Sequence, residues 1–238
     1  MEQKTILLLH GGGLSRWNFR AVAGALGDGY RVILPVLDGH AGSEYDFTSI
    51  EDNAQRLVDR IDAEFGGHVA VLGGLSLGAQ VALEMLARRP DICDHAILES
   101  ASVLPSRATA ALLGPSVAAS YGLIRRRWFA KMQAAYLRIP EDLFGDYYRD
   151  SCAMTRENLT RVLRASTLYA PPEGLEAVRA RVRIVVGGRE QAAMKKSARL
   201  LHDMIPGSAL EIRPGLRHGE YSLCTPQAYA DDLKEMLS

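Results

Sequence analysis

The chain has 238 residues, 47% of them hydrophobic, and its 28 basic and 28 acidic residues give a formal net charge of zero. This length suits one large domain or two small ones with a substantial core. The charge balance argues against nucleic acid or an anionic membrane as the main partner, although it leaves room for a local charged patch.

The cysteines and the first residues of the chain predict its compartment. Cys93, Cys152 and Cys224 are far apart and form no CxxC motif, which predicts reduced thiols and not a disulfide or zinc framework. The apolar run near the start, in MEQKTILLLHGGG, is too short for a signal peptide or a membrane span. We therefore expect a cytoplasmic protein without a membrane-spanning segment.

Hydrophobic patterning predicts strands that alternate with helices. The expected strands are Thr5–Leu9, Arg31–Val36, the apolar start of His68–Pro90, His95–Glu99, Val182–Gly187 and Ala209–Arg213. The expected helices between and after them are Trp17–Leu26 capped by Ser15, Ile50–Phe65 opened by a capping box in Thr48–Glu51, the second half of His68–Pro90, Ala192–Ile205 and Gln227–Leu237 capped by Thr225. Such alternation predicts an α/β fold with a mainly parallel sheet of about six strands and helices on both faces.

The stretch from about Ser102 to Gly174 departs from this alternation. It contains no convincing strand, and Pro105, Pro115, Pro140 and Pro171-Pro172 divide it into short helices. The expected helices are Ala108–Leu113, Tyr121–Leu137, Asp142–Cys152 and Glu157–Tyr169. We therefore predict a core of residues 1–101 and 175–238, with residues 102–174 inserted between the fourth and fifth strands as a helical cap. Most of its aromatic rings should attach the cap to the core, and a few should line a substrate pocket.

The stretch Gly74-Leu75-Ser76-Leu77-Gly78 has the pattern of a nucleophile elbow between a strand and a helix. A sharp bend forces its central residue into unfavourable backbone angles, and glycines two positions away keep the strand and the helix from colliding. Ser76 is therefore the candidate nucleophile.

A serine nucleophile needs a base, and the base needs an orienting group. His218 follows the last expected strand and is the candidate base, whereas a structural or solvated role is expected for the other five histidines. Two carboxylates end neighbouring strands: Glu190 after the fifth and Glu99 at the end of the fourth. We favour Glu190, because an acid after the insert suits the chain order serine, acid, histidine.

Attack on a carbonyl also requires donors for the oxyanion that forms. The N–H of Leu77, directly after the candidate nucleophile, is one expected donor. The second should come from His10-Gly11-Gly12-Gly13, where residues without side chains let an amide approach a ligand. We assign Gly12 to this role and keep Gly13 as the alternative.

Taken together, these motifs resemble the α/β-hydrolase superfamily over essentially the whole chain. The resemblance is carried by the glycines after the first strand, the loop Asp38–Ser43, the elbow, Gly187-Gly188-Arg189-Glu190, and His218-Gly219. It implies that the first and third strands are neighbours, so that the glycine loop and the elbow flank one crevice. This sequence differs from the usual pattern in having glutamate as the acid, a loop Asp38–Gly42 without proline, and no leading hairpin.

The resemblance implies a serine hydrolase, and we expect a carboxylesterase that cleaves small esters through an acyl-enzyme, with no cofactor or metal. An acyltransferase, a cofactor-free lyase or a carbon–carbon hydrolase could use the same residues, because fold does not settle function. A non-catalytic binding protein is the alternative of another class. The run Arg125-Arg126-Arg127 is interpreted as a solvated helix face, with attraction of an anionic substrate as the alternative. The oligomeric state stays open.

Overall fold

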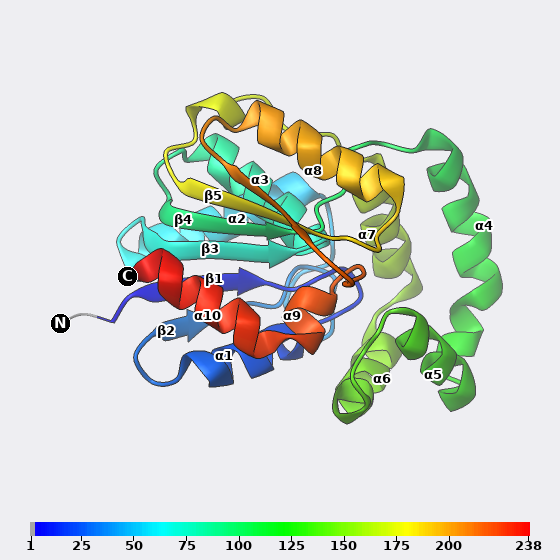
Figure 1. Cartoon of the computed structure of the whole chain (residues 1–238). Helices are drawn as coiled ribbons and strands as arrows, with labels where there is room; N and C mark the ends of the chain where they lie inside the picture. Colours follow the sequence, from blue (N-terminus) through cyan, green and yellow to red (C-terminus); the bar gives the residue numbers. More distant parts are fainter. Residues whose placement is uncertain (1–2) are drawn as a thin grey trace.

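The computed structural model describes residues 3–238, so Met1 and Glu2, the first residues of the predicted core, lie outside the described residues. Its centre is a parallel six-stranded sheet with the order β2-β1-β3-β4-β5-β6 (Figure 1). The strands are β1 (Thr5–Leu9), β2 (Arg31–Ile33), β3 (Val69–Leu75), β4 (Cys93–Glu99), β5 (Arg181–Gly187) and β6 (Ala209–Arg213). The predicted fold class is confirmed, and so is the pairing of the first strand with the third. Strand β2 is shorter than expected, because Pro35 cannot donate a backbone hydrogen bond to a ladder.

Helices cover both faces of the sheet. Helices α1 (Arg20–Leu26) and α10 (Pro226–Leu237) lie together on one face, and α2 (Ile50–Phe65), α3 (Leu77–Arg88) and α8 (Ala192–Met204) cover the other (Figure 1). Every residue of β3 is buried, as expected for a central strand of a parallel sheet covered on both sides.

The helices of the core differ from the sequence predictions at four places. The first helical segment begins as a 3-10 turn, η1 (Arg16–Phe19), and neither Ser15 nor Thr225 makes a side-chain capping bond. At α2, Ser49 is the N-cap and accepts the Asp52 N–H at 2.9 Å, so the capping box predicted from Thr48 is wrong by one residue. A short helix before the last one, α9 (Glu220–Cys224), was not predicted.

The segment between β4 and β5, called the helical insert below, contains four α-helices beyond the carboxyl ends of the strands (Figure 1). They are α4 (Arg107–Ile124), α5 (Arg127–Tyr136), α6 (Phe144–Ala153) and α7 (Arg156–Leu168), with the 3-10 turns η2 (Glu141–Leu143) and η3 (Leu175–Ala177). Contrary to the prediction, α4 continues through Pro115, and the break falls at Arg125-Arg126. Pro115 and Ala111 are both exposed, so the carbonyl that Pro115 leaves without an intrahelical partner can be hydrated. Within residues 3–238, no helix combines the length and apolar character needed to cross a bilayer.

The two glycines of the elbow are sterically required. A Cβ on Gly78 would lie 2.1 Å from the carbonyl oxygen of Leu9, and a Cβ on Gly74 would lie 2.3 Å from the carbonyl carbon of Gly78. The start of α3 therefore packs directly against the end of β1, which brings the elbow next to the glycine loop.

Gly78→Ala should lower the free energy of unfolding by about 3 kcal/mol or more, because backbone atoms would have to move to admit the methyl group. Gly24 is the matched control: it lies exposed in α1, and a Cβ added to it would meet no atom within 4 Å. Gly24→Ala should raise stability by about 0.5–1 kcal/mol. Urea unfolding of both variants measures the contrast, and equal effects of the two substitutions would contradict the steric argument.

Candidate active site

Ser76 lies at the junction of β3 and α3 with φ 53° and ψ −109°, in a region that residues other than glycine rarely occupy. Its backbone is held on both sides: its N–H donates to the carbonyl of Glu99 at 2.8 Å, and its carbonyl accepts the N–H of Gln80 at 3.0 Å. The strained turn leaves the Ser76 side chain partly exposed between two buried elements. A strained residue held by its surroundings in this way is typical of functional sites.

His218 and Glu190 form a direct pair. The imidazole Nδ1 lies 2.9 Å from Glu190 Oε2, and the Glu190 side chain is fully buried. The other carboxylate oxygen accepts Ser100 Oγ–H at 2.7 Å and the Gly187 N–H at 2.8 Å. Burial alone would raise the pKa of Glu190, but the contacts with His218, Gly187 and Ser100 outweigh it and hold this pKa below its usual value. An ionised carboxylate is thus positioned to orient the imidazole.

Backbone contacts bring these two loops together. The N–H of Arg189 donates to the carbonyl of Leu216 at 2.9 Å, and the N–H of Gly188 donates to the carbonyl of Arg213 at 2.8 Å. A Cβ on Gly187 would lie 2.4 Å from the Leu216 oxygen, so only glycine permits this approach. Ser100, which fixes the second oxygen of Glu190, was missed by the sequence interpretation. Its only signal was its place directly after the end of β4.

The loop that carries His218 also approaches the elbow. A Cβ on Gly219 would lie 3.4 Å from the side chain of Leu75, the residue before Ser76. Among the described residues, the ring of His218 hydrogen-bonds to Glu190 alone, and no hydrogen bond joins it to Ser76 Oγ. The imidazole is 45% exposed, so its Nε2 is free to meet a hydroxyl or a water molecule.

The glycine loop after β1 presents one free amide beside the elbow. The Gly11 N–H donates to Asn18 Oδ1 at 3.1 Å, and the Gly13 N–H donates to His40 Nε2 at 3.0 Å. Within residues 3–238, the N–H groups of Gly12 and Leu77 have no hydrogen-bond partner. A Cβ on Gly12 would lie 3.6 Å from Leu77 Cβ, so these two amides are neighbours. This arrangement favours Gly12 over Gly13 as the second donor.

Two buried histidines shape this loop. His10 Nε2 accepts the Leu37 N–H at 3.0 Å, and His40 Nδ1 lies 3.0 Å from the carbonyl of Asp38. Burial lowers the pKa of both, for His10 to about 3, so both rings are neutral. The structural role expected for these histidines agrees with these contacts.

Glu99, the alternative acid, makes no hydrogen bond to His218 within residues 3–238. Its Oε1 accepts the Ser222 N–H at 3.3 Å, and its Oε2 has no hydrogen-bond partner in the described part of the chain. Ser222 Oγ in turn contacts Asn18 Nδ2 at 3.4 Å, which links Glu99 to the residue that holds Gly11. Burial raises the pKa of Glu99 to about 7. Among the described residues, this buried carboxyl hydrogen-bonds to Ser222, whereas His218 hydrogen-bonds to Glu190.

The raised pKa of Glu99 predicts a pH dependence of stability. Between pH 4.5 and about 7 the folded protein binds a proton at Glu99 that the unfolded chain has released, so its contribution to stability falls as pH rises through this window. The loss should amount to about 3 kcal/mol between these limits. Urea unfolding at several pH values should show this slope in the wild type and a flatter profile in Glu99→Gln. Parallel profiles would contradict the assignment.

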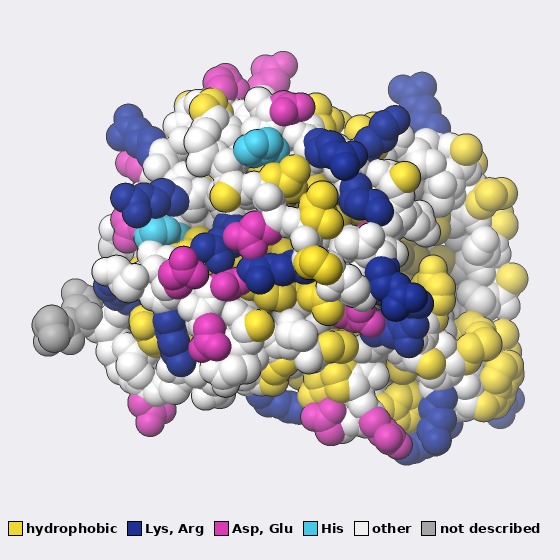
Figure 2. Space-filling model, viewed as in Figure 1, with side chains coloured by type: hydrophobic (Ala, Val, Ile, Leu, Met, Phe, Trp, Pro, Cys, Tyr) yellow, Lys and Arg dark blue, Asp and Glu magenta, His cyan; other side chains and the backbone are white. Residues whose placement is uncertain are grey.

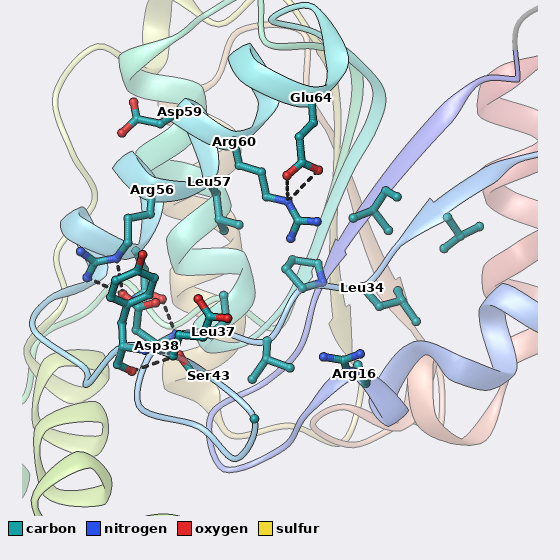
Figure 3. Close-up of a pocket in the computed structure, with 18 residues that line it drawn as sticks. Arg16, Leu34, Leu37, Asp38, Ser43, Arg56, Leu57, Asp59, Arg60 and Glu64 are labelled. Carbon is teal, nitrogen blue, oxygen red and sulfur yellow. Dashed lines mark hydrogen bonds and ion pairs between the residues drawn. The ribbon is translucent and has the colours of Figure 1, made fainter.

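Of two large surface cavities, only the smaller is lined by candidate catalytic residues. The larger, about 820 Å³, lies beside α2 and the segment after β2, and four of its charged residues form ion pairs, Asp38 with Arg56 and Arg60 with Glu64 (Figure 3). It contains neither the elbow nor His218. The second, about 720 Å³, is called the His218 groove and runs between the end of α5 and the loops after β5 and β6. It is lined by Ala135–Arg138, Arg189–Gln191, Met194, Arg217 and His218.

Within residues 3–238, no cluster of His, Cys, Asp and Glu has metal-binding geometry.

Comparison with known proteins defines the class. The sequence model of the Alpha/beta hydrolase family matches residues 6–232, so the chain belongs to this family. No curated protein sequence matches significantly. Among solved structures, it is similar to an esterase from Exiguobacterium antarcticum (TM-score 0.84, 20% identity, 100% of this chain and 93% of that chain). It is also similar to an enol-lactonase from Burkholderia xenovorans LB400 (TM-score 0.82, 16% identity, 100% and 92%). A thermophilic esterase from Thermogutta terrifontis is a third (TM-score 0.78, 21% identity, 99% and 91%).

Proposed function

We propose that this protein is a cytoplasmic serine hydrolase, a carboxylesterase that cleaves small esters through an acyl-enzyme. The observation that supports the proposal is that three features follow the carboxyl ends of strands in one parallel sheet: a strained serine, a histidine paired with a buried glutamate, and two amides without a hydrogen-bond partner within residues 3–238. Family membership supports the hydrolase class. Each group corresponds to one requirement of attack on an ester carbonyl.

In the proposed reaction, Ser76 Oγ attacks the ester carbonyl carbon while His218 Nε2 takes the hydroxyl proton. The carbonyl oxygen becomes an oxyanion that accepts the N–H groups of Gly12 and Leu77. The tetrahedral intermediate collapses with cleavage of the carbon–oxygen bond, and the imidazolium gives its proton to the leaving alcohol. Water, deprotonated by the same imidazole, then cleaves the acyl-Ser76 bond and regenerates the hydroxyl.

Glu190 serves this cycle as a fixed negative charge. Its contact with Nδ1 selects the tautomer in which Nε2 is free to accept a proton, and it stabilises the imidazolium that forms. Ser100 and Gly187 hold the carboxylate in place, so it can act without reorganising.

We further propose that residues 102–174 act as a cap over the site, and that the His218 groove admits the substrate. The groove combines two apolar side chains, Leu137 at the C-cap of α5 and Met194 on α8, with the imidazole itself. A groove of this size and mixed lining suits a small ester with an apolar portion.

Two measurements test the function. The protein is first treated with a fluorophosphonate, which should form an adduct on Ser76, found by mass spectrometry, in the folded but not the unfolded protein. Turnover is then compared for p-nitrophenyl esters of increasing chain length, with the matching anilides and lactones. Turnover of esters together with an adduct supports the proposal. Absence of an adduct would leave a non-catalytic binding protein, and an adduct without ester turnover would favour an acyltransferase or lyase.

A further inference from the structure

The helical insert contains a long stretch with charge of one sign only. From Ser100 to Pro140 the sequence holds no aspartate or glutamate but six cations: Arg107, Arg125, Arg126, Arg127, Lys131 and Arg138. Because the whole chain is formally neutral, the balancing negative charge lies elsewhere. This stretch is therefore a positive region on a neutral protein.

The same stretch carries most of the exposed large hydrophobic side chains. Seven of the nine found in residues 3–238 belong to it: Leu104, Leu112, Leu123, Trp128, Met132, Tyr136 and Leu137. Helix α4 buries only Ala110, Val117 and Ile124 of its 18 residues, although its composition is mostly apolar. A helix with so apolar a surface normally packs against a partner.

Helix α5 concentrates these side chains on one face. Trp128, Met132 and Tyr136 are spaced four residues apart and are 62%, 55% and 80% exposed, whereas Ala130 and Ala134 face inward. Helices α4 and α5 contact one another, and Figure 2 shows hydrophobic side chains gathered over the insert, at the right of the view. We call the exposed side chains of residues 104–138 the insert surface.

The cations of the insert surface are largely unpaired. In the described part of the chain only Arg138 has an ion pair, with Glu220 at 3.7 Å. Arg127 lies over the rings of Phe144 and Tyr148 at 5.3 and 5.9 Å, contacts that leave its charge unneutralised. A partner that neutralises the remaining cations must be anionic.

These observations distinguish between two possible binding partners of the insert surface. A second copy of the chain docked symmetrically would place these cations against the same cations, with no carboxylate from the stretch to compensate. An anionic bilayer surface satisfies both features, because its headgroups pair with Lys and Arg while Trp, Met and Leu enter the boundary of the acyl chains. We propose that the insert surface docks peripherally on anionic phospholipid membranes.

Docking in this way would place the groove beside the lipid. Tyr136, Leu137 and Arg138 belong both to the insert surface and to the wall of the His218 groove. An apolar ester dissolved in the bilayer could then reach the groove without crossing bulk water. Membrane binding itself does not depend on the proposed esterase function.

The test uses vesicles of phosphatidylcholine alone and vesicles in which about a third of the lipid is phosphatidylglycerol. The protein should float with the anionic vesicles and not with the neutral ones. Tryptophan fluorescence gives a second readout, because Trp17 is 2% exposed and Trp128 is 62% exposed. A blue shift on vesicle addition therefore reports insertion of Trp128.

Two variants test the two parts of the surface. Arg125→Gln with Arg126→Gln should weaken partitioning by about tenfold or more, and Met132→Ser with Tyr136→Ser should suppress the blue shift. The matched controls lie outside the insert: Lys196→Gln with Arg199→Gln on α8, and Tyr45→Ser with Ile212→Ser, all at exposed positions. The controls should bind as the wild type does.

Several results would overturn the proposal. They are equal binding to neutral vesicles, an effect of the control variants as large as that of the insert variants, or no binding at all. A dimer in solution that Met132→Ser with Tyr136→Ser dissociates, without vesicle binding, would assign the insert surface to a second copy. Ester turnover of the wild-type protein is measured on the same preparations. Turnover without vesicle binding would contradict only the proposed membrane docking, and vesicle binding without turnover would contradict only the proposed function.

Discussion

Ser76→Ala should lower the turnover of p-nitrophenyl esters by about 10⁴-fold or more and abolish the fluorophosphonate adduct. The reason is that the proposed mechanism assigns the nucleophilic attack to the Ser76 hydroxyl. The fold should persist, because the backbone contacts of Ser76 with Glu99 and Gln80 do not involve its side chain. Steady-state kinetics with circular dichroism at matched concentrations makes the comparison, and Ser116→Ala, at an exposed position on α4, is the control.

A second substitution at the same position separates catalysis from stability. Ser76→Gly should be as inactive as Ser76→Ala but more stable than the wild type, by about 1–3 kcal/mol, because glycine adopts a φ of 53° without strain. A melting temperature that rises while activity disappears would indicate that the backbone strain is retained for function. Ester turnover in Ser76→Ala comparable to that of the wild type would contradict the role assigned to Ser76.

Glu190→Gln should lower kcat by about 10⁴-fold with little change in KM. An amide at this position loses the negative charge that stabilises the imidazolium, and its NH₂ group can force the neutral ring into the tautomer that carries its proton on Nε2. The loss should appear in the chemical step, since Glu190 lies fully buried behind His218.

Glu99→Gln is the matched control for this experiment, because Glu99 is an equally buried carboxyl at the end of the neighbouring strand. Within residues 3–238 it hydrogen-bonds to Ser222 and not to His218, so its replacement should change kcat by no more than about tenfold. The reverse outcome, near-normal turnover in Glu190→Gln and loss in Glu99→Gln, would transfer the role of the acid to Glu99. Ser100→Ala should fall between the two, because it removes one hydrogen bond from Glu190 while leaving the charge in place.

The fold class and the elbow could both be predicted from the amino-acid sequence. Both depend on local rules: apolar runs of strand length, helical spacing, and the steric need for glycine at positions 74 and 78. The same rules gave a wrong prediction at Pro115, where a helix break was expected. Helix α4 continues through Pro115 because this side of the helix is exposed to water. The predicted capping box is also wrong: Thr48 and Ser49 can both cap a helix, and the structure uses Ser49, the stronger cap of the two.

The pairing of distant side chains and amides could not be predicted from the sequence and depends on how the whole chain packs. Glu190 and Glu99 have similar positions relative to the ends of their strands, so the sequence does not separate them clearly. The structure separates them because the loops after β5 and β6 approach each other through backbone hydrogen bonds and bring His218 to Glu190. The choice of Gly12 over Gly13 depended on His40, 27 residues away, which binds the Gly13 amide. Partners so distant in the chain leave no periodic pattern, because their contact is created by the order of the strands in the sheet and not by local spacing.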